Sequence, residues 1–177
     1  EILLPWQRSH GQSEGRYITY GVKERYDCRK WIQYANSQLG AKEKDIFLCG
    51  ISMGCATVLM TAGLKLPKNV RGIIADCGFT SPWEIVCHVV RKKYHLPPYP
   101  LMFFVNAICR IAAGFSLKEA SAEEAMKKNK IPVLFIHGDK DRYVPMWMTY
   151  RNYQACAAPK ELYIVPGAAH ALAFSYD

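Results

Sequence analysis

A serine flanked by two glycines is the first place where this sequence could do chemistry. Ser52 lies between Gly50 and Gly54 in the stretch Gly-Ile-Ser-Met-Gly. A short apolar run at 46–49 precedes it and a helix-like stretch follows it, an order that favours a sharp turn with an exposed nucleophilic hydroxyl. Glycines at both flanks would let such a turn pass close to its neighbours. The pattern alone also fits a small residue in a tight turn, because three fixed positions recur by chance.

A nucleophilic serine needs a base to take its proton and usually an acid to orient that base. Asp139 and Asp141 follow an apolar run at 131–136, and open parallel sheets place their sites at such strand ends. His170 lies in a loop of small residues after the last apolar run. The order serine, aspartate, histidine along the chain is one in which a parallel sheet with helices can present a catalytic triad. Spacing alone leaves both aspartates open as the acid.

Two residues near this site, His137 and Cys55, are more readily interpreted as structural than as catalytic. His137 lies at a strand end beside a glycine, where a histidine is more often a structural hydrogen-bonding group. Together with Asp139 and Asp141 it could mimic a metal site, but no further ligands are spaced to complete one. Cys55 adjoins Ser52 in a stretch with a buried pattern, which argues against a cysteine nucleophile. We predict that the protein uses no metal and no other cofactor.

The elements around these residues alternate between strands and helices. This alternation predicts an α/β fold with a mostly parallel sheet and helices on both faces. We expect strands at 46–49, 70–75 and 131–136 and within ELYIVPG at 161–167, and helices within 22–40, from Gly54 to about 64, and at 146–156. The first residues, EILLP, are expected to end one more strand.

Residues 81–130 interrupt the alternation. They carry no strand signal, and their helix-like pieces are split by prolines at 97, 98 and 100. We interpret them as a helical cap inserted between two parts of one core, 1–80, which contains Ser52, and 131–177, which contains the candidate acids and His170. Leu101, Phe103 and Phe104 in this cap are candidates for binding an acyl or aryl group of a substrate. Packing of the same side chains against the sheet would explain them almost equally well.

Four motifs occur in a characteristic order: RSHGQSEG, GISMG, HGDKDRYVP and GAAH. In this order and spacing they resemble the α/β-hydrolase superfamily, closest to its cytosolic bacterial carboxylesterase-like and serine-aminopeptidase-like branch. The resemblance implies Ser52 as nucleophile, Asp141 as acid and His170 as general base, with the Met53 amide as an oxyanion donor. Some relatives take the acid from the position of Asp76, which makes Asp76 a third candidate.

Composition bounds the remaining possibilities. A chain of 177 residues, half of them hydrophobic, is long enough for one domain with a sizeable core. Seven cysteines without CxxC spacing suggest reduced thiols in the cytoplasm. The net charge of +8 comes with no nucleic-acid motif, and the longest apolar stretch is too short to insert across a membrane. We expect a small-molecule ester or acyl substrate and no nucleic-acid partner, and the oligomeric state is left open.

The resemblance also predicts that part of the domain is missing from this chain. In the α/β-hydrolase order an earlier strand separates EILLP from the strand before Ser52, and the loop after that earlier strand carries the second oxyanion donor. We therefore expect N-terminal strands and this donor upstream of Glu1. Ester hydrolysis is the favoured function; amide or short-peptide hydrolysis, acyl transfer and a non-catalytic binding module stay open.

Overall fold

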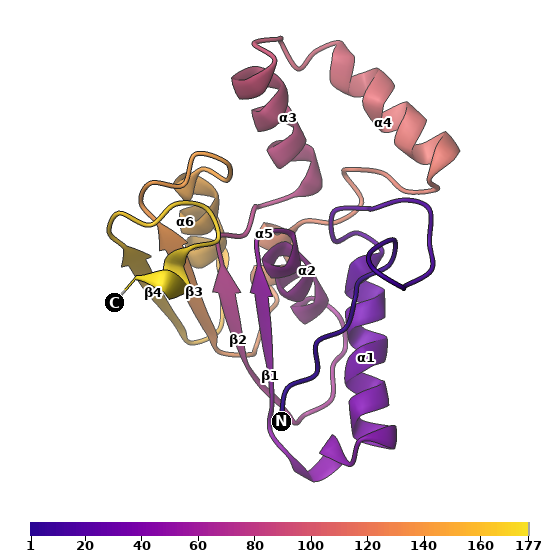
Figure 1. Ribbon diagram of the computed structural model, residues 1–177, viewed down its shortest axis with the longest axis vertical. Helices are drawn as coiled ribbons and strands as arrows, with labels where there is room; N and C mark the ends of the chain where they lie inside the picture. The colour runs from indigo at the N-terminus through magenta and orange to yellow at the C-terminus, as the bar shows by residue number, and fades with distance from the viewer. Residues whose placement is uncertain (177) are drawn as a thin grey trace.

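The computed structural model describes residues 1–176 as one parallel sheet with helices packed against it (Figure 1). The strands lie in the order β1-β2-β3-β4, and each neighbouring pair is parallel. The elements follow one another as α1 (Glu24–Gln38), η1 (Ala41–Glu43), β1 (Ile46–Ile51), α2 (Met53–Ala62), β2 (Val70–Asp76), α3 (Pro82–Lys93), α4 (Leu101–Ala112), α5 (Ala122–Met126), β3 (Val133–Gly138), α6 (Met146–Ala155), β4 (Lys160–Val165) and η2 (Ala173–Ser175). The predicted α/β class is confirmed.

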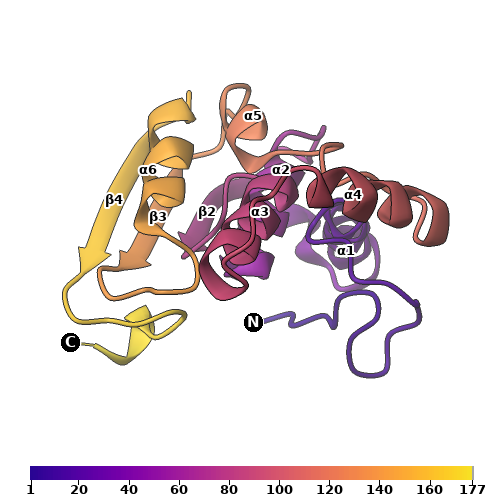
Figure 2. The same cartoon turned by 90° about the horizontal axis from the view of Figure 1, so that it is seen from above.

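Helices α2, α5 and α6 lie on one face of the sheet (Figure 2). Because β1 to β4 are added in a single direction, right-handed crossovers carry α2, α5 and α6 to the same side. The opposite face of β1 carries the exposed side chains of Phe47, Cys49 and Ile51. Helices on both faces were expected, and within residues 1–176 the connecting helices cover only one.

The core lies between the sheet and these helices. Leu48 of β1, Ile73 of β2 and Phe135 of β3 are buried in one cluster with Leu59 and Met60 of α2. Helix α2 is buried along most of its length because α1 and α5 pack on it from outside. This packing fixes the start of α2, and with it the position of Ser52, relative to the ends of the strands.

The cap segment divides into two parts with different surroundings. Helices α3 and α4 extend away from the sheet at the top of Figure 1. Helix α5, predicted within the same cap, packs against α2 and α6, and its Ala122 and Met126 are buried in the main core. The predicted domain boundaries at 80 and 130 stay a prediction, but α5 joins the core layer. From here on, "the cap" means α3, α4 and the loop between them.

The N-terminal residues are not a strand. Residues 1–7 have no regular structure, and Ile2 and Leu4 are largely exposed rather than paired with β1. A strand needs a neighbouring backbone for its hydrogen bonds, and within residues 1–176 these residues have no such neighbour in the sheet. The expected strand end at EILLP is therefore wrong for the described structure. None of the helices in residues 1–176 combines the length and the apolar character needed to cross a bilayer.

Candidate active site

Ser52 lies at a sharp turn between β1 and α2. Its backbone has φ 54° and ψ −115°, a conformation that side-chain-bearing residues rarely adopt. Such a conformation costs about 1–3 kcal/mol and is retained only where the surroundings enforce it. Here a hydrogen bond from the Ser52 N–H to the Asp76 carbonyl (2.9 Å) ties the turn to the end of β2. The turn thus holds the hydroxyl at the carboxyl edge of the sheet.

The two glycines of the motif differ in what they contribute. A Cβ at Gly50 would lie 2.4 Å from the Gly54 carbonyl oxygen, so the turn has no room for a side chain there. A Cβ at Gly54 would meet only the Gln7 side chain, at 4.0 Å. Close approach therefore requires glycine at position 50, and the expectation that both glycines make room is correct for only one of them.

A chain of hydrogen bonds runs from Ser52 through His170 to Asp141. The Oγ atom of Ser52 lies 2.9 Å from His170 Nε2, and His170 Nδ1 lies 2.7 Å from Asp141 Oδ2. Because a carboxylate only accepts, Nδ1 carries the ring proton and Nε2 presents its lone pair to the hydroxyl. This arrangement can transfer a proton from serine to histidine.

Asp141 accepts several hydrogen bonds, which fix its carboxylate beside His170. Burial disfavours its charged form, but the nearby His137 ring and the hydrogen bonds from His170 and from the backbone N–H groups of Tyr143 and Val144 outweigh burial. The net effect keeps the pKa of Asp141 well below its usual range. The carboxylate is therefore charged at neutral pH and can stabilise a protonated His170.

Contacts between two loops bring Asp141 and His170 together. The Asp139 N–H donates to the Val165 carbonyl (3.2 Å) and the Lys140 N–H to the Ala168 carbonyl (3.0 Å). At Gly138 a Cβ would lie 2.2 Å from that Ala168 oxygen, so only glycine allows this approach. The loop after β3 and the loop after β4 thus form one unit.

The other candidate acids have different surroundings. The Asp139 carboxylate accepts a hydrogen bond from the Gly167 N–H (2.7 Å), which fastens the histidine loop rather than the imidazole. Asp76 is buried at the end of β2, and its Oδ1 has no hydrogen-bond partner. Burial raises the pKa of Asp76. Of the three aspartates weighed as the acid, the one hydrogen-bonded to His170 is Asp141.

His137 has the structural surroundings expected for it. Its ring is fully buried; Nε2 donates to the Val144 carbonyl (3.0 Å), and Nδ1 lies 2.7 Å from Thr149 Oγ1. Its Nε2 also lies 3.4 Å from Asp141 Oδ2. His137 therefore helps to hold Asp141 in place and to keep its carboxylate charged. This supporting role of His137 toward Asp141 could not be inferred from their separation in the sequence.

Within residues 1–176, one group of side chains has the spacing to hold a metal ion. Ligand atoms of Cys77, Asp141 and His170 all lie within 4.8 Å of one another. Burial raises the pKa of the Cys77 thiol to about 12, and the other two residues are already hydrogen-bonded to each other. These residues do not match the cluster of His137, Asp139 and Asp141 weighed from the sequence, and catalysis without a metal stays a prediction. Burial also holds the pKa of the Cys55 thiol well above its usual value.

The helix start beside Ser52 supplies a hydrogen-bond donor. Met53 is the first residue of α2, so its N–H has no acceptor within the helix. The positive end of the α2 dipole adds to the attraction for negative charge at this point. The Met53 amide can therefore face a developing oxyanion on a substrate bound at Ser52.

The predicted substrate-binding residues lie on the cap. Leu101, Phe103 and Phe104 are all exposed on α4. Phe103 lines a hollow of about 360 Å³, whose lining does not include Ser52, Asp141 or His170. Their role in binding substrate therefore stays a prediction.

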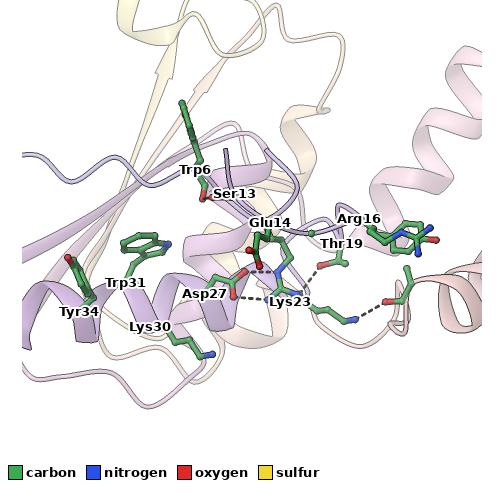
Figure 3. Close-up of a pocket in the computed structure, with 14 residues that line it drawn as sticks. Trp6, Ser13, Glu14, Arg16, Thr19, Lys23, Asp27, Lys30, Trp31 and Tyr34 are labelled. Atoms are coloured by element: carbon green, nitrogen blue, oxygen red, sulfur yellow. Dashed lines mark hydrogen bonds and ion pairs between the residues drawn. The ribbon is translucent and has the colours of Figure 1, made fainter. Parts of the chain in front are cut away.

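A larger hollow, of about 890 Å³, lies between the N-terminal loop and α1 (Figure 3). Its walls carry Trp6, Trp31 and Tyr34, and Lys23 crosses it to the Ala113 carbonyl (2.7 Å). Residues of the Ser52 hydrogen-bonded chain do not line it. The candidate active site is thus located by the proton-transfer chain and not by the size of a hollow.

Comparison with known proteins agrees with the fold. The chain is 32% identical over 174 residues to the uncharacterized protein YqkD of Bacillus subtilis, an alignment that covers 98% of this chain and 57% of YqkD. The esterase Pf2001 of Pyrococcus furiosus superposes with a TM-score of 0.66 at 22% identity, covering 93% of this chain and 60% of that one. Acetyl xylan esterase 1 of Thermoanaerobacterium superposes with a TM-score of 0.65 at 16% identity, covering 93% and 59%.

The two solved structures, at 22% and 16% identity, confirm the fold. The chain spans little more than half the length of YqkD. The sequence pattern of the prolyl oligopeptidase family matches residues 13–175, nearly the whole chain. The chain therefore belongs to the prolyl oligopeptidase family of α/β-hydrolases.

Proposed function

We propose that this protein is a serine hydrolase that cleaves a carboxylic ester through an acyl-enzyme on Ser52. The observation that carries the proposal is the unbroken hydrogen-bonded chain from Ser52 Oγ through His170 to Asp141. Nucleophile, base and acid come from three separate loops at one edge of the sheet. Such an arrangement is the requirement for activating a serine hydroxyl.

The proposed reaction has two steps. In the first, His170 Nε2 takes the Ser52 proton while Oγ attacks the ester carbonyl, and the Met53 N–H donates to the resulting oxyanion. The protonated His170, stabilised by the charged Asp141, then gives its proton to the departing alcohol. In the second step, water attacks the acyl group with His170 again as base, and Ser52 is regenerated.

The acyl group is the part of the substrate that the cap would contact. Leu101, Phe103 and Phe104 offer apolar surface on α4, and we assign them to the acyl or aryl portion of the ester. Seven free cysteines support a reducing compartment such as the cytoplasm as the place of action. The substrate is a small molecule in this proposal, and neither a metal nor another cofactor takes part.

Hydrolysis of amide bonds is a second candidate, because the family is that of prolyl oligopeptidase. The same serine, histidine and aspartate can attack an amide carbonyl, but the departing amine is a poorer leaving group and needs more help from His170 as acid. The chemistry at Ser52 is common to both reactions, so only the substrates separate them.

A paired measurement tests the proposal. We would compare kcat/KM for p-nitrophenyl butyrate with that for the matching p-nitroanilide, using the purified full-length protein and its Ser52→Ala variant. Ester turnover that exceeds amide turnover and disappears in the variant is the expected result. Faster amide turnover would favour the peptidase activity. A folded sample that turns over neither substrate would indicate a binding module.

A further inference from the structure

The cap and the loop after it form an unusually basic part of the chain. Between Glu84 and Glu119 the sequence has no acidic residue, whereas it has five cations: Arg91, Lys92, Lys93, Arg110 and Lys118. We call residues 85–118 the cationic segment. Among residues 1–176, the ion pairs of the structure involve none of these five side chains. Their charge is therefore free to attract an anionic partner.

The same segment exposes an apolar stripe on α4. Ile108 and Ile111 are 63% and 87% exposed. With 3.6 residues per helical turn, these two positions lie about 60° apart around the helix. Met102, on another side of α4, is fully buried and holds the helix to the protein. Helix α4 therefore turns a continuous apolar face toward solvent at the outer edge of the molecule (Figure 1).

Aromatic rings and cations meet beside this stripe. A hollow of about 360 Å³ is lined by Trp83, Tyr99, Phe103, Arg110 and Lys118, among others. The Lys118 Nζ lies 4.0 Å from the centre of the Trp83 ring. At the other end, Tyr94 and Leu96 are exposed next to Lys92 and Lys93. Apolar side chains with cations along their border are typical of helices that lie in a membrane interface.

We propose that the cationic segment docks on the surface of an anionic lipid layer, with the α4 stripe in contact with the acyl-chain boundary and the five cations among the headgroups. The apolar face gains from leaving water, and each cation gains from the negative surface potential. In this proposal the segment lies on the lipid surface; none of the helices in residues 1–176 is suited to span the bilayer.

Two other occupants, a second copy of the chain and a nucleic acid, fit this surface less well. Two copies of the chain joined through the α4 stripe would bring the same unpaired cations together with no acidic side chain of the segment to offset them. A nucleic acid would satisfy the cations but would leave Ile108 and Ile111 exposed to water. An anionic lipid surface satisfies both the charge and the apolar face. The proposal does not depend on whether Ser52 is catalytic.

Vesicle sedimentation tests the proposal with the purified full-length protein. The probes are vesicles of phosphatidylcholine alone and vesicles in which phosphatidylglycerol replaces part of the lipid. Ile108→Ser/Ile111→Ser removes the apolar stripe, and Lys92→Gln/Lys93→Gln removes two cations. Tyr163→Ser on β4 and Lys42→Gln/Lys128→Gln are matched controls, because these side chains are also exposed but lie outside the segment.

We expect binding to the anionic vesicles that weakens about fivefold for each lysine neutralised. The serine pair should weaken it by about tenfold or more, because it removes the apolar contact. The controls and Ser52→Ala should bind like the unaltered protein. Circular dichroism of each variant verifies folding, so a loss of binding cannot be mistaken for unfolding.

Several results would overturn the proposal. Equal affinity for neutral and anionic vesicles would remove the role of the cations, and no binding to either would remove the lipid surface altogether. Binding that falls with the lysine variant but survives the serine pair would indicate a purely electrostatic partner such as a nucleic acid. A lipid-free dimer that dissociates in the serine pair, measured by sedimentation velocity, would assign the stripe to a second copy.

Discussion

The carboxyl edge of the sheet and the cap hold their side chains in opposite ways. At the sheet edge, Asp141 accepts hydrogen bonds on both carboxylate oxygens and Gly50 has no room for a Cβ. On the cap, Ile111 is 87% exposed and the nearby cations lack ion-pair partners among residues 1–176. The edge fixes each atom in place, as proton transfer requires, whereas the cap leaves its surface open to a partner. Substitutions should therefore act on chemistry at the edge and on binding at the cap.

The largest effect at the edge is expected from Ser52→Ala. Without the hydroxyl no acyl-enzyme forms, so kcat for p-nitrophenyl butyrate should fall by about 10⁴-fold or more. The thermal midpoint should change little, because alanine keeps the Cβ and removes only the hydroxyl. Ser37→Ala, at an exposed helix end, is the control. Ester turnover above about a hundredth of the original would place the nucleophile elsewhere.

The two aspartates of the loop after β3 separate the acid from its neighbour. Asp141→Asn should lower kcat by about 10³–10⁴-fold, since an amide cannot stabilise the protonated His170 in the same way. Asp139→Asn weakens the bond to the Gly167 N–H and removes an exposed ion pair with Lys140, and it should lower kcat only a few-fold. Measuring kcat of both variants by steady-state kinetics shows which aspartate is the acid. The reverse ranking would make Asp139 the acid.

The two glycines around Ser52 test how tightly the turn is packed. Gly50→Ala should destabilise the protein by about 1–3 kcal/mol, because its Cβ would meet the Gly54 carbonyl oxygen. Gly54→Ala adds a Cβ in open space on a helix and should shift stability by less than about 1 kcal/mol. Urea denaturation of both variants gives the comparison. Equal destabilisation would show that the turn is not packed as described.

The smallest effect concerns acid stability, where Asp141 and Asp76 should act with opposite sign. Folding lowers the pKa of Asp141. The stability that Asp141 contributes is therefore fully present above its pKa in the unfolded chain, about 3.9, and is lost as pH falls through its pKa in the folded protein. Burial raises the pKa of Asp76. The stability that the protonated Asp76 contributes is therefore fully present below about 3.9, its pKa in the unfolded chain, and is lost as pH rises through its pKa in the folded protein.

Thermal midpoints measured against pH check these two signs. Asp141→Asn should make the loss of stability on acidification shallower. Asp76→Asn should instead reduce the loss that accompanies rising pH above about 4. A steeper acid loss in Asp141→Asn would contradict the hydrogen-bonded environment described for this carboxylate.

The strands that lead to the site could be predicted from the sequence, whereas the contacts between their loops could not. The strands around Ser52 and before Asp141 are short apolar runs, and the structure places them close to the expected positions. The pairing of His170 with Asp141 was implied by resemblance, since spacing alone left Asp139 open. The distinction between Gly50 and Gly54 depends on atoms that the turn brings within contact distance, and no sequence pattern carries that information.

Other features depend on the order of strands in space. Right-handed crossovers in one direction carry the helices to one face, and an alternating pattern of strands and helices does not reveal that direction. The packing of α5 against α2 and α6 likewise depends on tertiary contacts of a helix too short to show periodicity. The apolar residues of α4 were visible in the sequence, but their exposure was not.

Covalent labelling tests the central claim, that Ser52 is the activated nucleophile, most directly. The purified full-length protein would be incubated with a fluorophosphonate probe, digested, and analysed by mass spectrometry. The account predicts one phosphonylated peptide with the modification on Ser52, strong labelling of Asp139→Asn, weak labelling of Asp141→Asn and none of Ser52→Ala. A folded protein that is not labelled, or that is labelled on another residue, would contradict it.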